Sequence, residues 1–166
     1  KQRKHGQASH DRYILDYERG MELAPQWRDF VEELCGDRYR DFICRLLEVS
    51  NVRFRFHWHF TPNGGEVSPH CDSKGKIGSQ IFYLNTDDDW DWSWGGETVI
   101  LDDKGRIAAD NAPAFEDFDA VYPAQTKDNC SILFGRRGNF WHGVRRINCP
   151  ANYYRKVFIV VFEEYR

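Results

Sequence analysis

The sequence contains no hydrophobic segment long enough to cross a membrane as a helix. The longest uninterrupted apolar run in its 166 residues is Val157 to Phe162, whereas a spanning helix needs about 20 apolar residues. No apolar stretch near the first residue has the character of a signal peptide. We therefore expect no membrane partner.

An excess of positive charge is also missing. The chain has 23 Lys and Arg residues against 26 Asp and Glu residues, which gives a net charge of −3 at pH 7. Proteins that bind DNA or RNA usually neutralise phosphates with a basic patch. We therefore expect no nucleic-acid partner.

Cysteine pairs at the spacing of thiolate metal sites are missing as well. None of the five cysteines belongs to a C-x-x-C motif, which argues against a zinc site built on thiolates. Cysteines scattered through a chain of this size are typical of reduced thiols. We therefore expect a cytoplasmic location.

Aromatic residues, in contrast, make up 16% of the chain, and this content argues against disorder. The length suits one domain, since domains usually have about 100–200 residues. Neither an internal repeat nor a linker divides the chain. We therefore expect a single domain over residues 1–166.

Hydrophobic residues recur at the spacing of one helix face between Pro25 and Leu47. Gly36 falls on the opposite face, so the pattern predicts either one helix with a weak point or two short helices. This segment, about residues 24–49, is expected to pack on one face of a sheet. The first twenty residues are polar and are expected to be irregular.

The hydrophobic period then changes to two. Large apolar side chains in residues 52–60 alternate with Arg53, Arg55, His57 and His59. This alternation predicts a half-buried strand, with the basic face in solvent rather than lining a pocket. Further strands are expected at 80–85, 98–101, 131–134, 140–144 and 155–162. Many short strands after one helical segment predict a mainly β sandwich or barrel.

His70 and Asp72 have the spacing of two metal ligands at one strand end. Residues two apart in an extended chain project to the same side, so an imidazole and a carboxylate could bind one ion. A third ligand must come from elsewhere, and His142 is the natural candidate. Two histidines and one carboxylate are the ligands of non-haem Fe(II) oxygenases, with three positions left open. The His-x-Asp motif alone is a weak signal, and its weight comes from the motifs that follow it.

Four further motifs and a basic residue follow His70-Cys71-Asp72 along the chain. They are Tyr83-Leu84-Asn85, Trp94-Gly95-Gly96-Glu97-Thr98, Asn129-Cys130-Ser131-Ile132-Leu133-Phe134, His142-Gly143-Val144 and, at the start of an apolar strand, Arg155. The ordered set resembles the Fe(II)/2-oxoglutarate-dependent dioxygenases, most closely their prolyl-4-hydroxylase-like branch. The resemblance covers about residues 52–163.

The resemblance implies a fold, metal ligands and cosubstrates. The fold is a double-stranded β-helix (a cupin-like jelly roll), with the metal between its two sheets and the helical segment packed on one of them. His70, Asp72 and His142 would bind Fe(II), with no catalytic residue beyond them. Arg155 would form a salt bridge with the distal carboxylate of 2-oxoglutarate, and Tyr83 would hydrogen-bond it. O2 would be the other cosubstrate, with ascorbate as a candidate reductant.

The chemistry of Arg155 agrees with this role. A guanidinium is a planar, permanently charged fork that suits a carboxylate. Arg155 also shares a strand face with three apolar residues, Val157, Ile159 and Val161. A charged residue on such a face indicates a functional role, here the binding of an anion. The alternative is that Arg155 only caps the strand in solvent.

Two departures from the family pattern concern the binding of 2-oxoglutarate. The interval between the third ligand and Arg155 is longer than usual, so Arg145, Arg146 or Lys156 could bind the distal carboxylate instead. We expect Lys156, however, to point to the opposite strand face. The branch often has a Tyr ahead of the first metal ligand, where this chain has Phe60. One hydrogen bond to the cosubstrate is then missing or comes from another group.

The predicted reaction is hydroxylation of an aliphatic C–H bond with release of succinate and CO2. The substrate would be a small molecule, an amino acid or a peptidyl prolyl residue. Asp72 argues against halogenation, because halogenating relatives lack this carboxylate. Two alternatives stay open: a non-catalytic jelly-roll module that binds 2-oxoglutarate or metal, and a metal-dependent dioxygenase that uses no 2-oxoacid.

An acidic, Trp-rich segment runs from Asp87 to Trp94. It is either a mobile lid whose indoles stack on substrate or a solvated hairpin loop with a Trp or two folded onto the barrel edge. Cys71, between two ligands, is expected to point away from the metal. The candidate substrate contacts are Trp58, Phe60, Trp92 and Trp94.

Overall fold

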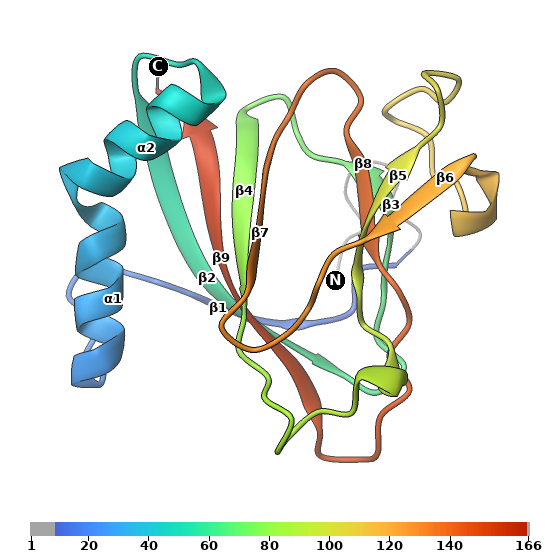
Figure 1. The fold of residues 1–166 in the computed structure, drawn as a ribbon, viewed down its shortest axis with the longest axis horizontal. Helices are drawn as coiled ribbons and strands as arrows, with labels where there is room; N and C mark the ends of the chain where they lie inside the picture. Colours follow the sequence, from blue (N-terminus) through green and yellow to red (C-terminus); the bar gives the residue numbers. More distant parts are fainter. Residues whose placement is uncertain (1–8, 166) are drawn as a thin grey trace.

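Two antiparallel β-sheets face each other in the computed structural model, which describes residues 9–165 (Figure 1). The larger sheet has the order β1 (Tyr13–Asp16), β2 (Val52–Pro62), β9 (Tyr154–Glu164), β4 (Lys76–Tyr83) and β7 (Ser131–Gly135). The smaller sheet has the order β3 (Val67–Cys71), β8 (Trp141–Val144), β5 (Thr98–Asp102) and β6 (Ala120–Pro123). Short 3-10 turns lie at Trp92–Trp94 and Phe115–Asp117. The predicted double-stranded β-helix is confirmed.

Two strands of the smaller sheet, β3 and β6, were not among the predicted strands. Each contains a proline, Pro69 in β3 and Pro123 in β6, and a proline argues against a central strand. Both strands lie at the edges of the smaller sheet, where a missing backbone N–H breaks no ladder between strands. Proline is tolerated at such edges, so its presence there is consistent with the fold.

Two helices, α1 (Pro25–Cys35) and α2 (Asp37–Leu47), cover the outer face of the larger sheet (Figure 1). Gly36 separates them in an extended conformation (φ −71°, ψ 159°), so the two-helix alternative is the right one. Pro25 lies in the first turn of α1, where a missing N–H costs no helical hydrogen bond. The buried helix residues pack against the aromatic outer face of the sheet; they are Val31, Leu34 and Ile43.

The long pairing of β2 with β9 separates an aromatic face from a polar one. The register runs from Val52 opposite Glu164 to Pro62 opposite Tyr154. The outer face belongs to the hydrophobic core under the helices, with Phe56, Trp58, Phe158, Val160 and Phe162 buried in it. The inner face looks toward the smaller sheet and carries His57, His59 and Thr61, directly opposite Ile159, Val157 and Arg155.

The solvent-facing prediction for the basic face of β2 is wrong at two of its four positions. His57 and His59 are only 9% and 8% exposed, because the smaller sheet and the N-terminal segment cover this part of the inner face. Arg53 and Arg55, at the other end of the strand, are exposed and form ion pairs with Glu163. An alternating pattern identifies two faces but does not say what covers each of them.

The N-terminal segment is partly regular, contrary to expectation. Tyr13–Asp16 pairs with β2 as an edge strand of the larger sheet, and His10 forms an isolated bridge with Val67 of the smaller sheet. Residues 9–16, here called the N-terminal strap, therefore connect the two sheets along one side (Figure 1). The remainder of the expectation, for residues 1–8, lies outside the described residues.

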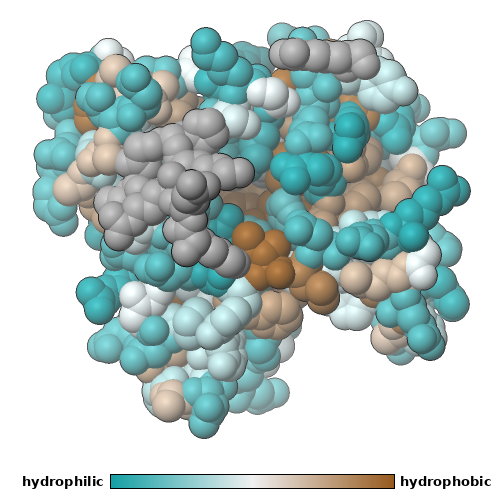
Figure 2. All heavy atoms as spheres, turned by 180° about the vertical axis from the view of Figure 1, so that it is seen from behind, coloured by the Kyte–Doolittle hydropathy of each residue, from teal (hydrophilic) through white to brown (hydrophobic). Residues whose placement is uncertain are grey.

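The face of the molecule seen from behind is largely hydrophilic, with a hydrophobic group near its middle (Figure 2). Three consecutive residues of the strap are among the exposed large hydrophobics: Tyr13, Ile14 and Leu15. Within residues 9–165, no helix is long and apolar enough to cross a membrane.

Candidate active site

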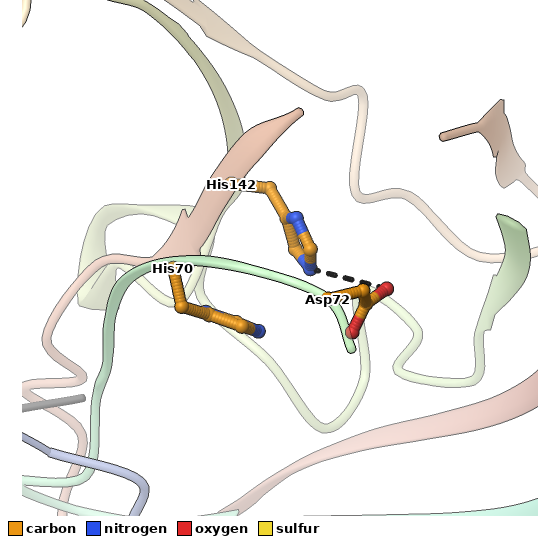
Figure 3. A group of neighbouring side chains, drawn as sticks. All are labelled: His70, Asp72 and His142. Atoms are coloured by element: carbon orange, nitrogen blue, oxygen red, sulfur yellow. Dashed lines mark ion pairs between the residues drawn. The ribbon is translucent and has the colours of Figure 1, made fainter. Parts of the chain in front are cut away.

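Three side chains with metal-binding groups converge between the two sheets. His70 lies near the end of β3, Asp72 follows directly after β3, and His142 lies in β8. His70 and His142 are paired in register, with their ring centroids 4.3 Å apart. One donor atom of each of the three residues lies within 4.8 Å of the other two, and all three side chains point toward one another (Figure 3).

Backbone carbonyls orient both imidazoles. The Nδ1–H of His70 donates to the carbonyl of Ser68 at 3.0 Å, and the Nδ1–H of His142 donates to the carbonyl of Phe140 at 3.4 Å. Each ring therefore has its Nε2 free for a metal, with the tautomer set by the second nitrogen. Lys76 Nζ donates to Asp72 Oδ1 at 3.0 Å. The other carboxylate oxygen lies 4.0 Å from His142 Nε2 (Figure 3).

The protonation states suit a divalent ion. Burial is the main cause that lowers the pKa of both His70 and His142, so both rings are neutral at pH 7. Burial alone would raise the pKa of Asp72, but the attraction of His142 and Lys76 outweighs it and holds the pKa below its usual value. Two neutral imidazole nitrogens and one carboxylate oxygen form the donor set that non-haem Fe(II) takes. These residues fit such an ion.

Arg155 lies on the inner face at the start of β9 and is only 7% exposed. Its Nη2 donates to Thr98 Oγ1 at 2.9 Å, and its guanidinium carbon lies 5.7 Å from the centre of the Tyr83 ring. The Tyr83 hydroxyl is buried beside Thr98 and makes no hydrogen bond of normal geometry within residues 9–165. Glu97 acts on Arg155 electrostatically, but no described carboxylate forms a direct ion pair with it. A buried cation beside a buried hydroxyl suits an anionic ligand.

The other basic residues, which the sequence offered as alternatives to Arg155, lie elsewhere. Arg145 and Arg146 are exposed, and Lys156 points to the opposite face of β9, where it forms an ion pair with Asp89. Gly96 lies so close to Arg155 that a β-carbon there would come within 3.0 Å of Arg155 Cδ. Its positive φ of 83° also favours glycine. The Trp-Gly-Gly segment thus leaves room for the arginine.

The family model described as the 2OG-Fe(II) oxygenase superfamily matches residues 55–162. This chain belongs to that superfamily. It is therefore an enzyme, a non-haem iron dioxygenase that uses Fe(II), 2-oxoglutarate and O2. The match spans the two histidines, the aspartate and the arginine of the site just described.

Solved structures agree on the fold of this oxygenase. A prolyl-4-hydroxylase from Pseudomonas putida is similar with a TM-score of 0.62 at 19% identity, covering 92% of this chain and 72% of that one. A 2OG-Fe(II) oxygenase family oxidoreductase from Burkholderia pseudomallei has a TM-score of 0.62 at 15% identity, covering 95% of this chain and 68% of that one. The sequence matches none of the curated proteins with which it was compared.

Asn85 of the Tyr-Leu-Asn motif holds the start of β9 in place. Its Oδ1 accepts a hydrogen bond from the backbone N–H of Lys156 at 2.7 Å, and its Nδ2 donates to the carbonyl of Tyr154 at 3.0 Å. These two bonds flank Arg155 in the sequence. Asn85 is buried, and the pair of bonds positions the backbone from which the arginine projects.

The acidic, Trp-rich segment packs against the long turn that precedes Arg155. Trp90 is buried together with Ile147 and Cys149, so the extra residues of the turn have a packing partner. Trp94 stacks edge-on with Tyr153 at 4.9 Å, and Trp92 Nε1 donates to Asp87 at 2.6 Å. Trp92 and Trp94 remain partly exposed. Their contact with substrate remains a prediction.

Trp58 and Phe60 lie on the helix-covered face of β2, away from the metal ligands. The Trp58 ring packs 4.9 Å from Phe158 and 5.2 Å from Trp27, and Phe60 packs against the same core. This placement does not support the predicted substrate contacts. Thr61, rather than Phe60, occupies the inward position opposite Arg155, and it is buried. Cys71 is buried in the core cluster around Trp141, away from the ligand donors.

Trp58→Ala is expected to lower the free energy of unfolding by about 3–5 kcal/mol, because it opens a large cavity in the core. Denaturant unfolding followed by circular dichroism measures this change. Trp92→Ala, at a partly exposed position, is the matched control and should cost much less. A nearly unchanged unfolding midpoint for Trp58→Ala would contradict the placement of this side chain.

Three polar residues near the site were not predicted from the sequence: Arg12 of the strap, His57 and His59. Arg12 Nε and His59 Nε2 are buried without a hydrogen-bond partner among the described residues. His57 Nδ1 lies 3.1 Å from an Asp16 carboxylate oxygen. The only sequence signal for the histidines was their alternation along one strand. Arg12 carried no signal, because its place depends on pairing with a distant strand.

Burial lowers the pKa of His59 well below its usual value, and the charge of Arg12 adds to this effect. The unfolded chain therefore binds a proton that the folded protein does not, below about pH 6.5. The contribution is fully present above that pH and is lost as the pH falls toward the lowered pKa. In metal-free protein, His59→Gln should reduce the pH dependence of unfolding free energy between pH 6.5 and 5 by up to about 1.4 kcal/mol per pH unit. An unchanged slope would contradict the burial of a neutral His59.

Proposed function

We propose that this oxygenase hydroxylates an aliphatic C–H bond of a small molecule, an amino acid or a peptidyl prolyl residue. One oxygen atom of O2 enters the product as hydroxyl, and the other enters succinate as 2-oxoglutarate loses CO2. The observation that supports this proposal most directly is the buried Arg155, which lies near a His-Asp-His cluster and forms no direct ion pair with a carboxylate of the described residues.

His70, Asp72 and His142 would hold Fe(II), which supplies the activation of O2 and the chelation of 2-oxoglutarate. The chain's own residues orient and protect the reactants. Ser68 and Phe140 fix the two imidazoles through their carbonyls. Lys76 occupies one oxygen of Asp72 and leaves the other for the metal.

Arg155, Tyr83 and Thr98 would bind the distal carboxylate of 2-oxoglutarate. The guanidinium supplies charge and two parallel donors, and the Tyr83 hydroxyl supplies a further donor that makes no hydrogen bond of normal geometry with the described residues. Thr98 holds the guanidinium through its hydroxyl. Asn85 keeps the backbone of β9 in register for this contact.

Tyr83→Phe tests the role of the hydroxyl. A hydrogen bond to a charged group contributes about 1.5–3 kcal/mol, so the KM for 2-oxoglutarate should rise roughly tenfold to a hundredfold with a small change in kcat. Initial rates of succinate formation at varied 2-oxoglutarate measure both. An unchanged KM would remove Tyr83 from the cosubstrate site.

The proposal as a whole is tested by supplying the protein with Fe(II), 2-oxoglutarate and 18O2 together with a panel of amino acids and proline-containing peptides. We expect at least one compound to raise succinate formation and to gain one 18O atom. Tight binding of 2-oxoglutarate with no consumption in any mixture would favour a non-catalytic binding module instead.

We retain a single domain over residues 1–166 and a cytoplasmic location as parts of this proposal. All five cysteines are free thiols in the structure, which suits a reducing compartment. The proposed domain comprises the two sheets and their helical cover.

A further inference from the structure

The N-terminal strap places polar side chains against the metal site. The ring of His10 lies 5.9 Å from that of His70. In the pairing of β1 with β2, Ile14 is opposite His59 and Asp16 is opposite His57, and both partners are on the inner face of the larger sheet. Arg12 precedes Ile14 by two residues, so it shares this face.

Arg12 is therefore a second arginine on the face that carries Arg155. Its Nε is buried and has no partner within residues 9–165. Burial, and then repulsion from Arg155, lowers the pKa of Arg12 to about 10, while the charge of Asp72 opposes this shift. The guanidinium is still charged at neutral pH. The strap that carries it runs from His10, whose ring is near that of His70, to Ile14, which is opposite His59.

His59 supplies a second unpaired group on the same face. The side chain is 8% exposed, and its Nε2 lacks a hydrogen-bond partner in the described part of the chain. Its pKa is lowered by burial first and by Arg12 next, so the ring is neutral. A neutral imidazole has one N–H to donate, and Arg12 has five.

These groups are costly without a ligand. A buried donor with no acceptor loses its hydration without compensation, and two nearby guanidinium groups repel each other. Asp72 is the acidic residue that acts on Arg12, and it is already engaged by Lys76 and aimed at the two histidines. In the proposed function, Arg155 is neutralised by 2-oxoglutarate. Among the described residues, Arg12 is then left without an anion of its own.

We infer that Arg12 and His59 form a second carboxylate subsite, which binds the substrate rather than 2-oxoglutarate. This inference rests on the proposed function and narrows its substrate class. The substrate is a small molecule with a free carboxylate, held by Arg12 so that its aliphatic part lies beside the metal. An internal prolyl residue of a peptide has no such carboxylate and would leave Arg12 unpaired.

Paramagnetic relaxation tests this subsite without a known substrate. Protein loaded with Mn(II), a redox-inert substitute, and saturated with 2-oxoglutarate is mixed with butanoate or N-acetyl-L-proline, each matched by its neutral amide. Faster proton relaxation reports binding near the metal. Relaxation of the 2-oxoglutarate protons in the same samples reports whether the cosubstrate complex itself has formed.

We expect both carboxylates to bind at least about tenfold more tightly than their amides, the difference that one charge-assisted hydrogen bond makes. Arg12→Gln should remove this difference and leave the relaxation of 2-oxoglutarate intact. Arg12→Lys, which keeps the charge, should retain part of this difference. Its partial binding would show that the effect of Arg12→Gln is not caused by unfolding. Arg19→Gln, at an exposed position in the same region, is the matched control and should behave as the wild type.

Four results would overturn the inference alone, and a fifth would overturn it together with the proposed function. Equal binding of acids and amides would indicate a neutral, peptide-like substrate, and no binding of either acid would show that the subsite does not form. The same preference for acids in wild type and Arg12→Gln would place the carboxylate elsewhere. Loss of 2-oxoglutarate binding in Arg12→Gln alone would assign Arg12 to the cosubstrate. Absence of 2-oxoglutarate relaxation in the wild type would instead contradict the proposed function, and this inference with it.

Discussion

Asp72→Ala is expected to lower succinate formation more than about 100-fold, a larger effect than the loss of an outer-shell partner of a metal ligand. The variant removes the anionic donor of the cluster and leaves two neutral imidazoles with a weaker hold on a divalent ion. The fold should persist, because Asp72 lies just beyond β3 and its carboxylate accepts a hydrogen bond from Lys76, which is only four residues away. A coupled assay of succinate and a circular dichroism spectrum measure the two properties.

Asp88→Ala is the matched control for this variant. Asp88 carries the same charge but is exposed in the Trp-rich segment, so its loss should leave turnover near the wild-type value. Succinate production by Asp72→Ala at a near-normal rate, in a folded protein, would contradict the assignment of the metal ligands.

Arg155→Gln is expected to raise the KM for 2-oxoglutarate between about 30-fold and several thousandfold. Truncating one partner of a buried, hydrogen-bonded charge pair costs about 2–5 kcal/mol, because the other charge is left unpaired. The glutamine keeps much of the side-chain volume, so the packing against Gly96 and Tyr83 changes little. Steady-state rates at varied 2-oxoglutarate give KM and kcat separately.

Arg146→Gln is the control for Arg155, since it is exposed and was one of the alternatives for the same carboxylate. It should leave the KM unchanged. Arg155→Lys should recover part of the affinity, because it restores the charge without the planar fork. Normal activity of Arg155→Ala would instead favour the alternative of a metal-dependent dioxygenase that uses no 2-oxoacid.

The central strands and the helical cover could be predicted because their signals are local. Alternation in residues 52–60 identified most of β2, and the aromatic members of that pattern do lie under the helices. Gly36 marked the break between two helices. The His-x-Asp motif and His142 could be read as a cluster because strand geometry projects them to one side and the family pattern supplies the third member.

The remaining features depend on contacts between distant segments. β1 is short, and its strand pairing is with β2, which is distant in the sequence. The burial of His57 and His59 depends on the smaller sheet and the strap, neither of which is encoded in residues 52–60. The same holds for Arg12, whose inward direction follows from the register with β2. β3 and β6 were not predicted because each contains a proline. Both are edge strands, and the position of a strand at an edge is a property of the whole sheet.

An anaerobic titration of the metal-free protein with Fe(II) and then 2-oxoglutarate tests the central claim most directly. We expect a visible charge-transfer band to appear when 2-oxoglutarate chelates the bound metal, and to be absent from His142→Ala. A well-folded wild-type protein that shows no band at saturating Fe(II) and 2-oxoglutarate would contradict the assignment of this site.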